Sequence, residues 1–215
     1  MNLFKPCILA LFGWSAMVSH AVALIDIQPK IAEVRDTAMT VEIANNGERP
    51  EYVSITLSRI INPGVELADE RLELISQTPR PQLYASPFKL KLAPGQSKII
   101  TLKPLEQVEK EQVYRLDIKP VMNVLEPKQA DVVGTVLINL AFSALVRHLP
   151  LIETSTLSVT CDSEGARLIA TGTTHFLVEG ATANGQSIDP FGVYPDVPIV
   201  MRGRNIQISA HPPCL

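Results

Sequence analysis

The residues of this chain best suited to specific chemistry are Cys161, Cys214, His175 and His211. Their thiolate and imidazole groups are the ligands that zinc prefers in tetrahedral protein sites. Only His211 and Cys214 lie close in sequence, whereas compact zinc sites usually bring their ligands in closely spaced pairs. The competing interpretation is a disulfide between the two cysteines, which depends on export to an oxidising compartment.

The first residues of the chain indicate export. They contain a positive charge at Lys5, an apolar stretch over residues 7–18 and the small residues 21–23 in the pattern of a cleavage site. We expect residues 1–23 to be a signal peptide and the mature protein to begin at Leu24. The apolar stretch is too short to cross a bilayer, and no later stretch approaches the roughly 18 apolar residues of a membrane span. We therefore predict a protein without membrane insertion, a disulfide between the cysteines at positions 161 and 214, and no metal site.

Motifs typical of catalysis are absent from the sequence. There is no Gly-x-Ser-x-Gly elbow, no phosphate-binding glycine-rich loop and no His-Glu-x-x-His, and His148, His175 and His211 lack an obvious serine or cysteine partner. The formal net charge is −3, and loss of the single lysine of the signal makes it one unit more negative. Such a mild acidity does not favour nucleic acid or anionic membranes. We predict a protein that is not an enzyme and needs no cofactor.

Short β-rich stretches separated by proline, glycine and asparagine recur about every ten residues, which predicts an all-β chain and a β-sandwich. In the third stretch Val53, Ile55 and Leu57 alternate with serine and threonine, so one face should be buried. Pro94 and Gly95 predict a turn that joins the fifth and sixth stretches as a hairpin-like pair. The predicted strands cover residues 24–28, 38–44, 51–60, 71–76, 88–92, 97–102, 112–121 and 132–148.

After Pro150 the predicted strands become shorter and the loops richer in glycine and proline. Because proline cannot continue a central ladder, we place a boundary there, with a first domain over residues 24–149 and a smaller β-domain over 150–215. A disulfide would close most of this second domain, whose core is thin at about 65 residues. Its predicted strands cover residues 154–159, 166–171, 175–179 and 205–209.

The stretch GTVLINLAFSALVRHLP, residues 134–150, is apolar on both sides of an extended chain. Val136, Ile138, Leu140 and Phe142 fall on one side, and the odd-numbered residues 137–143 on the other. Such a strand is either buried on both faces or carries an apolar row that something else covers.

Four motifs, in this order along the chain, carry a resemblance to a known family: IINPG (60–64), LAPGQSK (92–98), EQVYRL (111–116) and ALVRHLP (144–150). With them the chain resembles the PapD-like periplasmic chaperones of the chaperone-usher pilus pathway. It is most similar to the alternate branch that serves fimbriae of the colonization factor antigen I type. The likeness covers residues 24–150 and fades beyond them.

The resemblance implies two immunoglobulin-like β-sandwich domains and a periplasmic chaperone whose partners are fimbrial subunits and an outer-membrane usher. In that family the last strand of the first domain lends a row of apolar side chains to a subunit that lacks its own final strand. By the family pattern this row is Val136, Ile138 and Leu140, with Phe142 as an extension. Leu137, Asn139 and Ala141 would then face the chaperone's own core. The alternative, that the row packs inside this sandwich, stays open.

The family also anchors the subunit's terminal carboxylate with two basic residues. The position of the usual lysine falls on Leu145, so the resemblance leaves Lys30 and Arg147 as the anchor candidates. The alternatives are an interdomain salt bridge for Arg147 and a solvated surface charge for Lys30. In a regular strand Arg147 and Ile138 lie on opposite faces, so a bulge near the boundary would have to bring both to one subunit. For Arg115 we expect an internal structural role.

The competing function is a structural one: an exported pilus subunit or minor fimbrial component. Such a protein should carry an N-terminal donor extension and an unfinished sandwich, whereas strand-like sequence begins here almost directly after Ala23. Whether the free protein covers its apolar row by self-association stays open.

Overall fold

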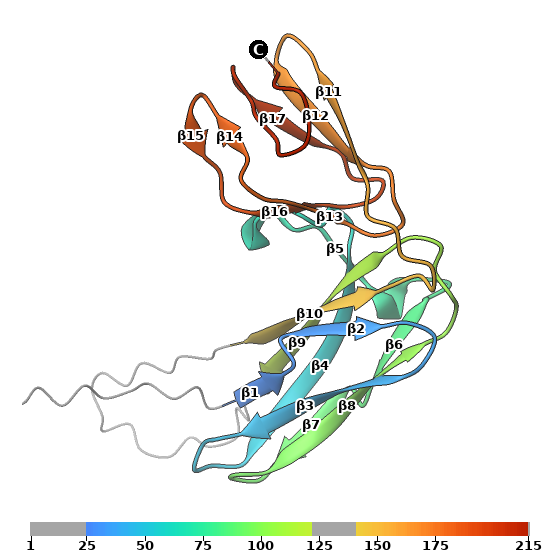
Figure 1. Cartoon of the computed structure of the whole chain (residues 1–215). Helices are drawn as coiled ribbons and strands as arrows, with labels where there is room; N and C mark the ends of the chain where they lie inside the picture. Colours follow the sequence, from blue (N-terminus) through green and yellow to red (C-terminus); the bar gives the residue numbers. More distant parts are fainter. Residues whose placement is uncertain (1–24, 122–140, 215) are drawn as a thin grey trace, which may run out of the picture.

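The computed structural model describes residues 25–121 and 141–214, and their regular structure is β-strand apart from two short 3-10 helices. Figure 1 shows two β-rich parts set at an angle, with the earlier strands in one and β11 to β17 in the other. The helices are η1 (Leu67–Asp69) and η2 (Ile75–Gln77). The all-β prediction is confirmed.

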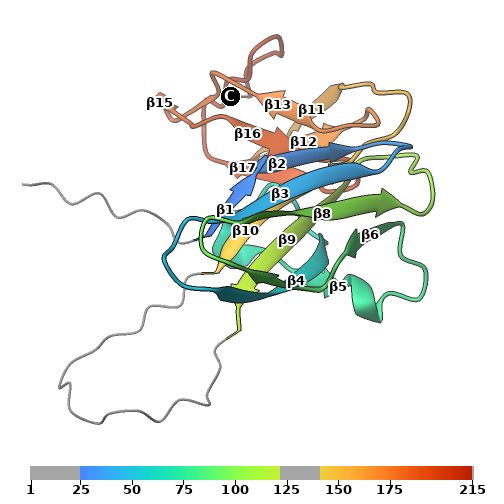
Figure 2. The ribbon, with the colours of Figure 1, turned by 90° about the horizontal axis from the view of Figure 1, so that it is seen from below.

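The first sheet of the larger part has the strand order β1-β3-β8-β6, and all of its ladders are antiparallel. Figure 2 shows β1, β3 and β8 side by side from below. Its strands are β1 (Ile25–Gln28), β3 (Met39–Asn45), β8 (Ser97–Pro104) and β6 (Leu83–Ser86).

The second sheet has the order β2-β10-β9-β4-β5, and β7 also pairs with β4. Strand β2 runs parallel to β10, whereas the other ladders of this sheet are antiparallel. Its strands are β2 (Ile31–Val34), β10 (Phe142–His148), β9 (Gln112–Pro120), β4 (Glu51–Ile60), β5 (Leu72–Leu74) and β7 (Lys89–Leu92).

Alternate residues of both sheets fill a single core. The predicted inward face of β4 is confirmed, since Val53, Ile55 and Leu57 are all buried. Ile100 and Leu102 meet them from the other sheet and have no exposed surface. At about 25 cal/mol per Å² of buried apolar surface, this packing is the main term that stabilises the sandwich.

The predicted hairpin around Pro94 and Gly95 is wrong. Strand β7 pairs with β4 in the second sheet, while β8 pairs with β3 and β6 in the first. The turn is present, with Gly95 at φ +68°, but it carries the chain from one sheet to the other. Leu92 and Ile100 therefore both point into the core between the sheets and are fully buried.

The first domain also contains two short strands that the sequence did not predict, β2 and β6. The predicted strand over residues 71–76 is shorter than expected, because β5 ends at Leu74 and η2 follows at once. The remaining predicted strands that lie within the described residues agree with the structure to within one or two residues at most ends.

The smaller part consists of one three-stranded sheet, β11-β12-β17, and two two-stranded sheets, β13-β16 and β14-β15. Residues 205–209 form isolated bridges to Thr182 and Cys214 instead of the predicted strand. The strands are β11 (Leu157–Cys161), β12 (Gly165–Ala170), β13 (Phe176–Val178), β14 (Thr182–Ala183), β15 (Gln186–Ser187), β16 (Phe191–Val193) and β17 (Ile199–Arg202).

The predicted disulfide is confirmed: Cys161 at the end of β11 is bonded to Cys214, and the two residues are 53 positions apart. A second cluster of buried side chains, which includes Leu168 and Ile206, packs beside it and is separate from the first core. The boundary between residues 149 and 150 stays a prediction.

We predict that replacing both cysteines, Cys161→Ser with Cys214→Ser, lowers the free energy of unfolding of the smaller part by about 3 to 4 kcal/mol. The bridge closes a long loop and so lowers the conformational entropy of the unfolded chain. Without the bridge the unfolded chain regains this entropy, which favours unfolding. Urea unfolding followed by circular dichroism measures the change. A reducing agent should lower the free energy of unfolding of the wild type by the same amount and leave that of the double variant unchanged. Equal stability of the wild type and the double variant without a reducing agent would contradict the prediction.

Candidate functional site

Metal chemistry has no support among residues 25–121 and 141–214, where no group of three or more His, Cys, Asp or Glu side chains is placed to hold an ion. Both sulfurs of the zinc interpretation are in the Cys161–Cys214 disulfide. The His211 ring lies near the carbonyl oxygens of Ser209 and Leu157, at 3.1 and 3.3 Å. These four candidate ligands therefore do not form one site.

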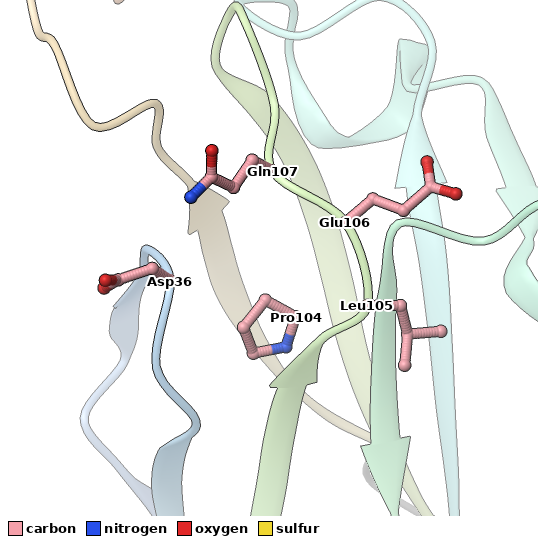
Figure 3. Close-up of a pocket in the computed structure, with 5 residues that line it drawn as sticks. All are labelled: Asp36, Pro104, Leu105, Glu106 and Gln107. Carbon is pink, nitrogen blue, oxygen red and sulfur yellow. The ribbon is translucent and has the colours of Figure 1, made fainter.

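A shallow pocket of about 140 Å³ lies at the end of β8 (Figure 3). Figure 3 shows the carboxylates of Asp36 and Glu106 pointing away from each other, so they form no acid–base pair. The pocket is lined by Asp36, Pro104, Leu105, Glu106 and Gln107, a set without a hydroxyl, thiol or imidazole group and without a cation. It offers no catalytic arrangement.

Strand β10, which follows the predicted donor row in the sequence, is paired on one side only over its first three residues. Strand β9 pairs with β10 from Phe142 to His148, but the ladder with β2 begins only at Leu145. The Leu145 N–H donates to the Lys30 carbonyl at 2.9 Å, just before β2. Within the described residues, no strand pairs with residues 142–144 on that side. Such an edge accepts an added strand.

The two faces of β10 differ in environment. Ala144 and Val146 are fully buried in the first core, and His148 is buried on the same side. Burial lowers the pKa of the His148 imidazole, which favours its neutral form. Leu145 and Arg147 point away from this core, and the register places Leu145 beside Ile31, whose exposed fraction is 57%.

Val136, Ile138 and Leu140 lie outside the described residues, so their donation stays a prediction. Phe142 is partly buried and packs against the first core, whereas Ala141 is exposed. The expectation that Ala141 faces the chain's own core is therefore wrong, and Phe142, named as an extension of the donor row, lies on the inward side, since Ala144 and Val146 place the even-numbered residues of β10 inward.

A bulge that would bring Arg147 to the face of Ile138 does not occur in the described part of β10. Its register with β9 is continuous from Phe142 to His148. Arg147 and Phe142 consequently lie on opposite faces of one regular strand.

Arg147 joins a network of charged groups where the two parts meet. Its Nε donates to Glu111 Oε1 at 2.7 Å and its Nη1 to Glu33 Oε1 at 2.7 Å. Its Nη2 lies 2.9 Å from Nδ1 of His175, which belongs to the smaller part. The sequence left a salt bridge between the parts as an alternative for Arg147; both of its observed ion pairs stay within the larger part, and its contact with the smaller part is the one to the His175 ring.

Glu111 is the buried centre of this network, with no exposed side-chain surface. It accepts a hydrogen bond from the backbone N–H of His175 at 2.7 Å, and its own N–H donates to the Thr173 carbonyl at 2.8 Å. Burial alone would raise the pKa of Glu111, but the bonds from His175 and Arg147 outweigh it and lower that pKa. The His175 ring also stacks on Tyr194, with ring centroids 5.0 Å apart.

The other two basic residues singled out by the sequence also have carboxylate partners. Lys30, which is exposed, pairs with Asp26 at 2.5 Å. Arg115 pairs with Glu70 on the outward face of the second sheet, where both side chains are mostly buried. Sequence spacing could not have shown the network at Arg147, because Glu33, Glu111 and His175 are 114, 36 and 28 positions away.

No family model matches the chain. A curated Escherichia coli protein described as a subunit of CS1 fimbriae is 26% identical over 113 residues. That match covers 51% of this chain and 46% of the other protein, so it spans about half the length of the curated relative.

Solved structures are similar over most of the chain. The crystal structure of the class 5 fimbriae chaperone CfaA has a TM-score of 0.67 at 21% identity, covering 87% of this chain and 93% of that one. A chain from the chaperone–tip adhesin complex of CFA/I fimbriae biogenesis has a TM-score of 0.66 at 22% identity, covering 87% and 94%. A chain from the CsuC–CsuE complex of archaic Csu pili of Acinetobacter baumannii has a TM-score of 0.56 at 14% identity, covering 83% and 91%. The chain thus has the two-domain β-sandwich fold of the fimbrial chaperones.

We predict that Glu111→Gln lowers the free energy of unfolding at pH 7 by roughly 2 to 4 kcal/mol, because a buried charge partner of Arg147 is lost. A lowered pKa in the folded state means that the stabilisation by Glu111 is complete above its ordinary value of 4.5 and is lost as the pH falls through the lowered pKa. The gap between the variant and the wild type should therefore close in acid. Chemical denaturation at a series of pH values measures it.

The matched control is Glu42→Gln, which neutralises an exposed carboxylate on the outer face of the first sheet. It should change stability by no more than about 0.5 kcal/mol. A constant gap between Glu111→Gln and the wild type from pH 7 to pH 3 would show that the charge of Glu111 is not what stabilises the junction.

Proposed function

We propose that the chain is a periplasmic chaperone that binds fimbrial subunits by donor-strand complementation and delivers them to an outer-membrane usher. The observation that carries this proposal is the open side of β10 at residues 142–144. It directly follows the alternating apolar residues Val136, Ile138 and Leu140. The similarity of fold to fimbrial chaperones supports it independently.

Donor-strand binding needs both properties of this stretch. A subunit with an incomplete sandwich has an unpaired strand edge and an apolar groove. A strand inserted there supplies ladder hydrogen bonds from its backbone and apolar side chains from one face. Each large side chain that fills the groove contributes about 1.5 to 3 kcal/mol before the cost of ordering.

We assign the subunit's terminal carboxylate to the cations beside this edge, Arg147 and Lys30. If the subunit's sandwich pairs with the open side of β10, its side chains can contact both faces of that strand. It therefore reaches the outward face that carries Leu145 and Arg147 without a bulge in β10. Lys30 flanks the same side, since its carbonyl binds the Leu145 N–H.

The structural alternative, an assembled pilus subunit, fits the described residues less well. A subunit would lack the last strand of its sandwich, whereas β10 lies between β2 and β9. We propose no catalytic role for the chain, and the similarity of its fold to fimbrial chaperones supports this. No helix within those residues is long and apolar enough to cross a membrane.

The proposal is tested by co-expressing the chain with a candidate fimbrial subunit and purifying the complex from the periplasm. We predict that Ile138→Asp weakens binding by at least about tenfold, because a buried apolar contact of about 1.5 to 3 kcal/mol is replaced by a charge. The matched control is Ile99→Asp on the outer face of the first sheet, where the wild-type side chain is 58% exposed. It should bind like the wild type.

The yield of complex and its dissociation constant give the readout, and circular dichroism verifies that both variants are folded. If the folded Ile138→Asp variant binds the subunit as tightly as Ile99→Asp does, the donor row is assigned wrongly.

A further inference from the structure

The imidazole of His148 is buried without a hydrogen-bond partner. The residue has no exposed surface, and neither ring nitrogen is hydrogen-bonded to any group within residues 25–121 and 141–214. A neutral imidazole carries one donor and one acceptor, and leaving such groups unpaired in a protein interior costs free energy. This ring belongs neither to the charged network at Arg147 nor to the open side of β10.

His148 is the last residue of β10 and lies where the larger part ends. In the two ladders it is opposite Val34 of β2 and Gln112 of β9. The N–H of the next residue, Leu149, donates to the Val34 carbonyl at 2.8 Å. Pro150 follows and has no N–H, so the ladder cannot continue there. The ring is therefore enclosed at the point where β10 leaves the sheet.

No carboxylate of the described residues pairs with this ring. On the β9 side, Gln112 Oε1 accepts a hydrogen bond from Arg59 Nη1 at 3.4 Å, and that arginine pairs with Glu73 at 3.3 Å. The pKa of His148 is lowered by burial, which outweighs the opposite effect of the Arg35 carbonyl, and no charged side chain contributes to this shift.

The other titratable groups around the strand end are neutral or point away. Tyr114, two residues along β9, is buried, and burial raises its pKa to about 12, so it stays uncharged. The side chains of Arg35 and Asp36 are exposed, and Glu33 and Arg147 pair with each other on the outward face. The inward side chains of the first sheet are apolar. The structure thus offers a charged imidazole no compensation.

A proton on His148 would place an unpaired charge in the interior. Such a charge loses its hydration and gains no ion pair, so the ring can hold the proton only where it reaches water. The structure nearest to the ring that can give way is the end of the strand itself, which the Leu149 N–H holds to β2.

We propose that His148 is an acid-sensitive latch, which holds the end of β10 against β2 while it is neutral and opens residues 147–149 when it is protonated. The opening also loosens the junction of the two parts, because the neighbouring Arg147 carries the contacts to Glu111 and His175. The ladder between β3 and β8 stays closed.

The direction of the pH dependence follows from the pKa values of the two states. The ring has a lowered pKa in the closed state and its ordinary value of 6.5 in the open state, so the open state binds the proton more tightly. The latch is therefore intact well above pH 6.5. It weakens as the pH falls below 6.5, until the pH also falls below the lowered pKa of the closed state.

Amide hydrogen exchange of the full chain at pH 7.5 and pH 5.5, corrected for the intrinsic exchange rates, measures this opening. We expect the opening constant at the Leu149 N–H to rise by about three- to tenfold at the lower pH, where the ring of the open state is mostly protonated. Amides of the β3–β8 ladder should keep their protection.

Three variants assign the response to a particular ring. His148→Leu replaces the imidazole by an apolar side chain that takes no proton, and it should abolish the pH dependence at Leu149. His211→Gln is the matched control, because it removes a histidine of the smaller part and should leave the response unchanged. His175→Gln removes the other histidine at the junction, and the response at Leu149 should persist.

The inference is overturned if His148→Leu keeps the acid response at Leu149 or if His175→Gln abolishes it. Equal loss of protection through the β3–β8 ladder would show global unfolding and also overturn it. An NMR titration of the imidazole in the wild type needs no variant: a His148 pKa at or above 6.5 would mean that the ring charges inside the closed strand, against the proposal. None of these outcomes depends on whether the chain binds a fimbrial subunit.

Discussion

The ladder between β2 and β10 covers only the last four residues of β10, and this single limit shapes the larger sandwich. From Leu145 onward the strand is paired on both sides, and its even-numbered side chains complete the first core. Before Leu145 it keeps only β9 as a neighbour among the described residues. An edge of this kind is either shielded from other chains or pairs with a partner's strand, because unpaired backbone groups beside apolar side chains promote association.

The other constraint is the buried carboxylate of Glu111. It takes hydrogen bonds from Arg147 in one part and from His175 in the other, so the junction is held by a charged group that cannot reach water. Taking such a group out of water is expensive, and it is compensated only while all its partners remain in place. The same network orients Arg147 on the outward face of β10, in the part of the strand that is paired with β2.

Much of the fold was readable from local patterns. The alternation of Val53, Ile55 and Leu57 identified the inward face of β4, and the cysteine pair in a chain that begins with an expected signal peptide predicted the disulfide. Turn chemistry was less informative: Pro94 and Gly95 specify a change of direction, but whether the next strand stays in the same sheet depends on packing across the core. Strand β2 was missed because four residues after a proline give too short a pattern.

The site was harder to predict than the fold. Arg147 and its partners come from strands and loops that are distant in sequence, and only the parallel β2–β10 ladder brings Glu33 opposite Arg147. The phase of β10 was also assigned wrongly at Ala141, because a stretch that is apolar on both sides does not reveal which side is inward. The apolar composition of residues 134–150 was nevertheless the signal that pointed to a strand with a partner.

Amide hydrogen exchange across the whole chain, measured with and without a bound fimbrial subunit, tests the central claim most directly. Donor-strand binding predicts that the largest gain in protection falls on residues 134–144, since their backbone would enter the ladder of the subunit. A subunit that binds while protecting the strands of the smaller part and leaving residues 134–144 unchanged would contradict it.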